Sequence, residues 1–225
     1  MPWALHLVCY WFGGFMRFSS LISGSVAAFL SLTFLLSAKA SAGTGSDFQC
    51  RYLVAIENGF LSQHVKYSEL NLALQDKVVD QYIKHLDPTK VYLLQADVDK
   101  IKKSLSKIFD KLKDKDCTPL DEVQKTLVEK VKERAEYAKG LLNKDFKFDS
   151  KVELVFDPDK KQYPATVAEA NEFLRKYVHF QISNYLATDM KLDEAKTNVM
   201  KNWDRTLKRI IETKQDDIYS DYLDA

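Results

Sequence analysis

Serine and lysine side chains beyond residue 42 are the first candidates for chemistry, because such a pair can cleave an acyl bond. The reaction needs a nucleophile beside a base and backbone donors for the oxyanion. The chain has no Gly-x-Ser-x-Gly turn, and Gly59 and Gly140 are the only glycines beyond residue 45. Tight turns that require positive φ are hard to build from two glycines. The sequence therefore predicts neither a Ser-Lys dyad nor an oxyanion loop, and we assign no catalytic residue.

Histidines and carboxylates also lack the spacing of metal ligands. His64, His85 and His179 are scattered, and no His-Glu-x-x-His sequence occurs. Glutamates at 129, 133 and 136 share one expected helix with several lysines, which is typical of solvated ion pairs rather than of a di-metal site. We predict no metal site and no cofactor.

Two cysteines lie beyond residue 42, Cys50 and Cys117. In an oxidising compartment they could form a disulfide. Closing a loop of this size stabilises a fold by about 4 kcal/mol in the chain-entropy treatment. Two separate thiols are an equally open alternative at this stage.

Residues 1–42 have the composition of a secretory signal peptide. Their charges are Arg17 and Lys39, a long apolar run follows Arg17, and alternating alanines end the segment. Met16 is a second candidate for the start of the chain. The alternative is a membrane anchor that is retained, because the run approaches the ~20 apolar residues of a spanning helix. We expect a periplasmic or secreted protein with one domain over 43–225.

The charge balance bears on the class of partner. The chain has 33 basic and 32 acidic residues, and removing residues 1–42 leaves 31 and 32. A nucleic-acid-binding protein would show a clear basic excess, so no nucleic-acid partner is expected. Membrane contact is expected only through an uncleaved signal peptide.

Apolar residues recur at spacings of three and four along most of the chain. Such stripes predict amphipathic helices that pack on one another, and the scarcity of glycine agrees with them. Thr118 and Thr166 are expected to cap two of the helices. The fold class predicted is all-α, an orthogonal or bundle-like arrangement of several helices. The expected helices cover about 70–86, 97–112, 118–142, 166–182, 192–211 and 218–225.

Residues 143–165 interrupt the helical pattern with turn signals and a short β-prone run. We predict one long irregular loop there, with a small hairpin as an alternative. Long loops in compact domains often carry function, and Phe156 and Tyr163 are its candidate residues for contact with a partner.

The last expected helix is short, and its apolar residues Tyr219, Tyr222 and Leu223 have no obvious continuation in the sequence. Helices of about two turns are marginal on their own. This favours a domain that is truncated at Ala225.

Three blocks of the chain resemble the N-terminal helical domain of bacterial tail-specific proteases, also called C-terminal processing proteases. They are the Asp-Pro turn within 82–97, the loop and helix start within 157–170, and the basic helix end and final helix within 205–225. Leu174 departs from the family pattern, where a tryptophan is expected.

The resemblance implies a non-catalytic region of a periplasmic serine endopeptidase. Such a region would pack against the protease core, formed by PDZ and catalytic domains in the same or another chain, and offer a docking surface to a substrate or adaptor protein. The family's Ser-Lys dyad lies in its catalytic domain, so no catalytic residue carries over. Two alternatives are a stand-alone secreted helical binding or regulatory module and a membrane-anchored structural protein.

Overall fold

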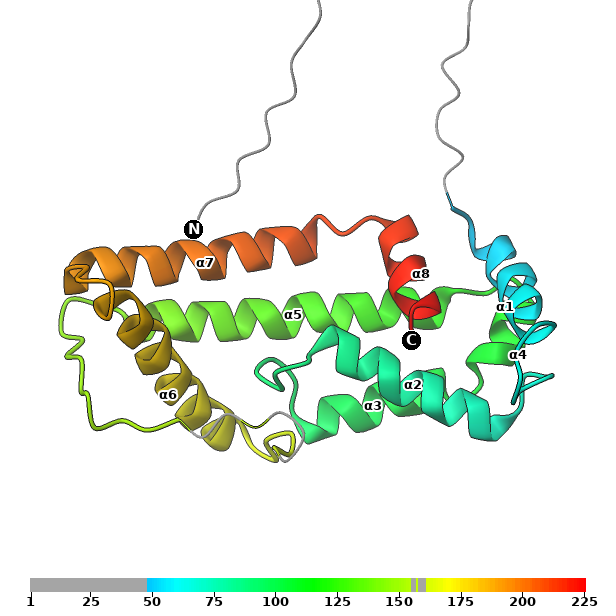
Figure 1. Cartoon of the computed structure of the whole chain (residues 1–225), viewed down its shortest axis with the longest axis horizontal. Coiled ribbons are helices and arrows are strands. Elements are labelled where there is room, and N and C mark those ends of the chain that lie inside the picture. Colours follow the sequence, from blue (N-terminus) through cyan, green and yellow to red (C-terminus); the bar gives the residue numbers. More distant parts are fainter. Residues whose placement is uncertain (1–47, 155–156, 158–160) are drawn as a thin grey trace, which may run out of the picture. The chain divides into compact units, whose positions relative to one another are not determined.

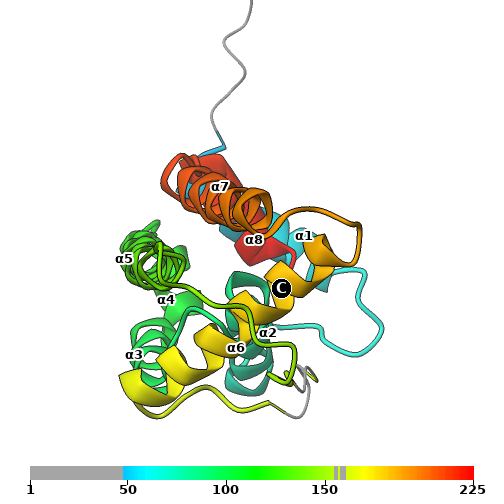
Figure 2. The same ribbon diagram turned by 90° about the vertical axis from the view of Figure 1, so that its left-hand side faces the viewer.

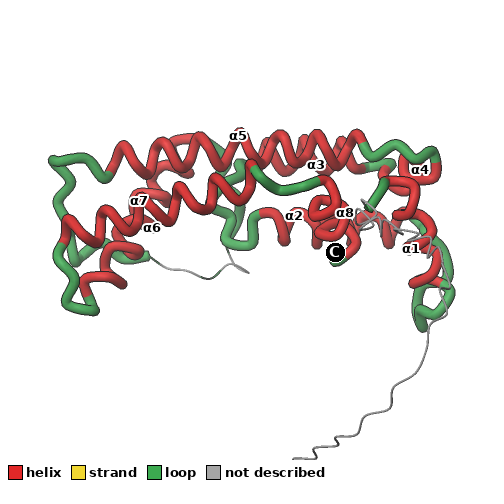
Figure 3. The backbone as a smooth tube through the Cα atoms, turned by 90° about the horizontal axis from the view of Figure 1, so that it is seen from above, coloured by secondary structure: helices red, strands yellow, loops and turns green. Residues whose placement is uncertain are grey.

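The computed structural model describes residues 48–154, 157 and 161–225, so the predicted signal peptide lies outside the described residues. The described part contains helices and loops but no strand (Figures 1 and 3), which confirms the all-α prediction. The hairpin alternative is therefore not realised in the described part of 143–165. The helices are η1 (Cys50–Tyr52), α1 (Leu53–Leu61), α2 (Leu72–Leu86), α3 (Gln95–Leu105), α4 (Ile108–Lys113), α5 (Thr118–Leu141), α6 (Val167–Leu186), α7 (Leu192–Ile211) and α8 (Gln215–Leu223).

The single helix expected over 97–112 is wrong, because the structure divides it into α3 and α4. Gln75 of α2 enters the break: its Nε2 donates to the carbonyl of Ser106 at 2.6 Å, and its Oε1 accepts from the backbone N–H of Phe109 at 3.2 Å. This buried amide satisfies backbone groups that a helix end leaves without partners. A side chain from α2 therefore stabilises the break between α3 and α4.

The helix starts agree with the expected capping at α6 and differ at α5. Thr166 accepts a hydrogen bond from the N–H of Glu169 at 3.2 Å, as the sequence predicts. Thr118 is not a cap but the first residue of α5, and its N–H donates to Asp116 Oδ1 at 3.0 Å. Hydrogen bonds from Thr118 and Lys111 lower the pKa of Asp116 to about 2.

Two clusters of buried side chains lie along α5. The first core is formed by α1 to α4, the first half of α5 and α8. The second core is formed by the second half of α5 with α6 and α7, and it also receives Val91. Figure 1 shows α7 running beside α5, and Figure 2 shows α7 and α3 on different sides of α5. The long central helix thus belongs to both cores.

The last helix, α8, packs on the rest of the described chain, and whether the domain is truncated at Ala225 stays a prediction. Ile218, Tyr219 and Tyr222 are buried in the first core. The Tyr222 ring meets the ring of Tyr82 edge-on at 5.8 Å, so α8 completes this core. None of the helices in the described part combines the length and apolarity needed to cross a membrane.

Candidate functional site

The turn after α2 is organised by the carboxylate of Asp87. This side chain is fully buried. Its Oδ1 accepts from the N–H of Val91, and its Oδ2 accepts from those of Tyr92 and Leu93, all at 2.9 Å. Burial raises the pKa of the Asp87 carboxyl, while these three donors and the charge of Lys161 lower it. One side chain therefore fixes the path of the chain from α2 to α3.

Lys90 gives this turn its sharp bend. Its φ of 52° lies in the left-handed region, which non-glycine residues seldom adopt. Lys90 Nζ donates to the carbonyl of Lys161, so the residue at the tip of the turn also holds the long loop.

Lys161 makes the reciprocal contact from that loop. Its Nζ donates to the carbonyls of Thr89 at 3.2 Å and Lys90 at 2.7 Å, and it lies 3.0 Å from the centre of the Phe173 ring. Burial lowers the pKa of the Lys161 ammonium to about 8. The N–H of Gln95 donates to the carbonyl of Pro164 at 2.9 Å. The loop is thereby fastened to both ends of the turn.

A groove of about 850 Å³ opens beside the turn, and we call it the turn groove. It is bounded by the end of α2, the turn, α5, α6, α7 and α8. Gln124 of α5 donates to the carbonyl of Ile210 of α7 at 2.8 Å, which joins two of these elements. The lining residues are His85, Leu86, Pro88, Thr89, Tyr92, Gln124, Leu127, Tyr177, Arg205, Lys208, Arg209, Ile210, Glu212, Thr213, Asp217 and Asp221.

The lining of the turn groove combines aromatic, basic and acidic side chains. Burial raises the pKa of Tyr92 to about 12 and also raises that of Tyr177. The lining also includes basic side chains from the end of α7 and acidic side chains from α8. Burial and the neighbouring Asp217 raise the pKa of Asp221, which His85 lowers. Such a groove suits a polypeptide segment that carries apolar and charged residues.

The described residues show no arrangement suited to peptide hydrolysis or to metal binding. The described residues contain no group of three or more histidine, cysteine or acidic side chains that could hold a metal ion. Ser104 and Lys107 do have the Ser-x-x-Lys spacing of some serine hydrolases, which the sequence analysis overlooked. Here Ser104 Oγ donates to Glu122 at 3.2 Å, and Lys107 lies beyond the end of α3. These contacts give the hydroxyl no lysine base.

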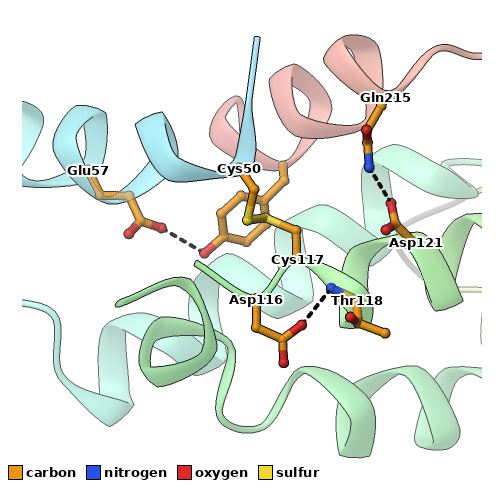
Figure 4. The surroundings of a disulfide bond; sticks show 8 residues. Cys50, Glu57, Asp116, Cys117, Thr118, Asp121 and Gln215 are labelled. Carbon is orange, nitrogen blue, oxygen red and sulfur yellow. Dashed lines mark hydrogen bonds between the residues drawn. A yellow bond between two sulfur atoms is a disulfide. The ribbon is translucent and has the colours of Figure 1, made fainter. Parts of the chain in front are cut away.

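The predicted site residues lie in separate places. The structure joins Cys50 and Cys117 by a disulfide, with their Cα atoms 5.9 Å apart (Figure 4), and this bond links η1 to the start of α5. Phe156 lies outside the described residues. Tyr163 is half-buried against the first core, with Lys90 Nζ 5.6 Å from its ring centre. Its contact with a partner stays a prediction.

The residues of the turn groove were not predicted as a site. Arg205, Lys208 and Arg209 were noted only as part of a sequence block, and all three are exposed. Their clustering at a helix end was the available signal. The position of the turn opposite them depends on tertiary packing and could not be derived from the spacing alone.

Two comparisons with known proteins cover this region. A family model described as tail-specific protease N-terminal domain matches residues 56–225. The tail-specific protease of Haemophilus influenzae is 29% identical over 163 residues, which are 72% of this chain and 24% of that protein. The chain thus spans about a quarter of the length of this curated relative.

Proposed function

Because this chain belongs to the family of tail-specific protease N-terminal domains, we propose that it serves as the non-catalytic part of a periplasmic tail-specific serine protease. In this proposal residues 1–42 direct export and are removed. The folded domain packs against a protease core, in the same chain or as a separate subunit, and the core carries the Ser-Lys dyad. The chain by itself then hydrolyses no peptide bond.

The contacts of one turn with two distant segments of the chain support this proposal. The turn within 82–97 holds the loop within 157–170 through Lys90 and Lys161. The same turn borders the turn groove, whose other side is built from 205–225. These are the segments by which the sequence resembles the family. Buried hydrogen bonds to Asp87 hold the turn in place, and a surface that is held rigid loses little entropy on docking.

We assign to the turn groove the docking of a substrate or adaptor segment. Its basic side, formed by Arg205, Lys208 and Arg209, is exposed. Charged groups at such a rim steer association and set specificity. An extended segment of mixed charge would place acidic residues along α7 and its basic residues along α8.

The size of the native protein tests the association with a protease core. We expect an immunoblot of the producing cells, with an antibody raised against residues 60–225, to show an envelope protein several times larger than this chain. A separate core subunit would instead co-purify with a smaller band. A small band without any co-purifying peptidase would contradict the proposal.

Charge reversal tests the turn groove. We expect Arg209→Glu in the intact protease to lower kcat/KM for an unfolded envelope protein about fivefold, mainly through KM. Arg175→Glu is the matched control, because Arg175 pairs with Glu172 on α6 and does not line the groove. Equal effects of both variants would show that the groove is not used. Peptide hydrolysis by the purified chain alone, abolished by mutating one of its residues, would refute its non-catalytic role.

A stand-alone binding module is a second candidate. It is favoured by the burial of Ile218, Tyr219 and Tyr222, because the first core of the chain covers the apolar side of α8. Cooperative unfolding of a monomer, together with a native band slightly smaller than 225 residues and no associated peptidase, would support this candidate.

A further inference from the structure

A second hollow lies at the corner where α1, α2 and the end of α8 meet. It has a volume of about 310 Å³ and a mostly apolar lining. Small-ligand sites start at about this size, and the central residues of protein interfaces also fill well-packed pockets. We call it the corner pocket. Its lining residues are Glu57, Phe60, Leu61, His64, Tyr67, Leu70, Leu74, Val78, Phe109, Tyr222, Leu223 and Ala225.

Glu57 is the one acidic side chain in this lining, and it is 8% exposed. Its Oε1 accepts a hydrogen bond from the Tyr222 hydroxyl at 2.9 Å (Figure 4). Its Oε2 has no hydrogen-bond partner among the described residues. Burial raises the pKa of the Glu57 carboxyl, against the opposing effects of the Tyr222 hydrogen bond and of the more distant charge of Lys113. A buried carboxylate with an unmet acceptor is costly alone and favours a cationic or N–H donor from a ligand.

Apolar side chains continue outside the corner pocket. Phe60 is 68% exposed at its rim, and Val65 and Leu72 are exposed in the loop after α1 and at the start of α2. A neighbouring hollow of about 550 Å³ also includes Phe60 and His64. Exposed apolar surface that extends beyond one pocket is typical of contacts between proteins. The occupant suggested by this surface is a protein segment rather than a small molecule.

Other polar side chains of the corner pocket make local hydrogen bonds. The Glu57 carboxylate is therefore the group that would select what the pocket binds. His64 Nδ1 already accepts from the N–H groups of Lys66 and Tyr67, both at 3.0 Å. The Tyr67 hydroxyl accepts from Lys77 at 2.7 Å. These groups are occupied by local contacts, whereas Glu57 keeps an unpaired oxygen.

We propose that the corner pocket binds an apolar segment of a partner protein, with a lysine or arginine of that segment paired to Glu57. The corner pocket and the turn groove share no lining residue. This proposal therefore goes beyond the function proposed above, and either one can fail while the other holds.

Peptide titration followed by amide chemical shifts tests this proposal on the chain as purified from producing cells. The probe is acetyl-Leu-Leu-Lys-Leu-amide, compared with the same peptide carrying glutamate in place of lysine. We expect the lysine peptide to shift signals of residues 57–74 and 222–225 in a saturable way. The glutamate peptide should bind about tenfold more weakly, because it offers no cation to the carboxylate.

Matched variants separate binding from folding. Glu57→Gln keeps an acceptor for Tyr222 but removes the charge, and should weaken the lysine peptide about tenfold. Phe60→Ser changes a rim side chain that is 68% exposed, and should also weaken binding. Val167→Ser, at an exposed apolar position at the start of α6, should change nothing. The proposal is overturned if the shifts are absent or elsewhere, if both peptides bind equally, or if Glu57→Gln and Phe60→Ser bind as the unmodified chain does.

Discussion

The two cores along α5 are assembled in different ways. The second core is made chiefly of consecutive segments, the end of α5 followed by α6 and α7. The first core brings together parts that are far apart in the chain: the Tyr222 hydroxyl bonds to Glu57 at a separation of 165 residues, and Phe48 meets Tyr219 edge-on at 6.2 Å. The first core also contains the disulfide.

This difference indicates that the first core benefits more from a covalent cross-link than the second. Contacts between distant residues carry a larger loop-closure entropy than contacts between neighbouring helices. A covalent bond lowers that cost, and it stands in the core that has the more distant contacts. We therefore expect reduction of the disulfide to destabilise the first core more than the second. A change at residues that contact both cores should destabilise both.

The largest effect is expected at the turn that both cores share. Asp87→Ala would leave three backbone N–H groups without an acceptor, those of Val91 in the second core, of Leu93 in the first and of Tyr92, which packs against both. We expect the free energy of unfolding to fall by about 4.5 kcal/mol, at about 1.5 kcal/mol per group. Urea unfolding would measure this, with Asp87→Asn losing less because its amide oxygen still accepts. A loss below about 1 kcal/mol would show that the carboxylate does not hold the turn.

Removing the disulfide should separate the cores. The double change Cys50→Ser and Cys117→Ser opens a loop between residues 67 positions apart. We expect a loss of about 4 kcal/mol, with reduced hydrogen-exchange protection in α1 and α2 and nearly unchanged protection in α6 and α7. A reductant should reproduce the effect in the original chain and do nothing to the variant. Equal loss of protection in both cores would contradict the comparison.

A cavity in the second core should give the converse result. Leu174 on α6 is fully buried, and Leu174→Ala should cost about 3 kcal/mol through lost packing and a residual cavity. Trp203 belongs to the same cluster, so its fluorescence reports the transition. We expect the same loss with the disulfide intact or reduced. A loss that depends on reductant would mean that the cores do not respond independently.

The smallest effect concerns the loop between the cores. The folded pKa of Lys161 is about 8, below its usual 10.5. Between these values the unfolded chain binds more protons, so this residue makes stability rise as the pH increases from about 8 to about 10.5. We expect Lys161→Met to lack that part of the rise in urea unfolding over this range. Identical profiles of stability against pH for the original chain and the variant would contradict a lowered pKa of Lys161 in the folded chain.

Most of the fold was predictable because its helices show apolar residues on one side and charged residues on the other. The helix α1 was not predicted, since Leu53, Val54, Ile56, Phe60 and Leu61 leave no polar side to define a stripe. The division between α3 and α4 was also missed. It depends on the amide of Gln75, which arrives from α2 and is invisible to any pattern within the divided segment.

The candidate sites were less predictable than the helices. The Asp-Pro turn was located from the sequence, but three hydrogen bonds to one carboxylate depend on the backbone path after Pro88. Glu57 reads as an ordinary polar helix residue until Tyr222 packs against it. In both cases the chemistry depends on burial, which tertiary contacts determine.

The disulfide also determines how the domain would bear mechanical tension. The two ends of the described chain, near Phe48 and Ala225, both pack against the first core. A force that separates them would pass from Cys50 directly to Cys117, since the bond bypasses α1 to α4. With 67 positions bypassed, the chain stretched to its limit would be roughly 230 Å shorter than in the reduced protein. Pulled from both ends, the oxidised domain would bear the force along α5 to α8, and α1 to α4 would stay outside the path of the force.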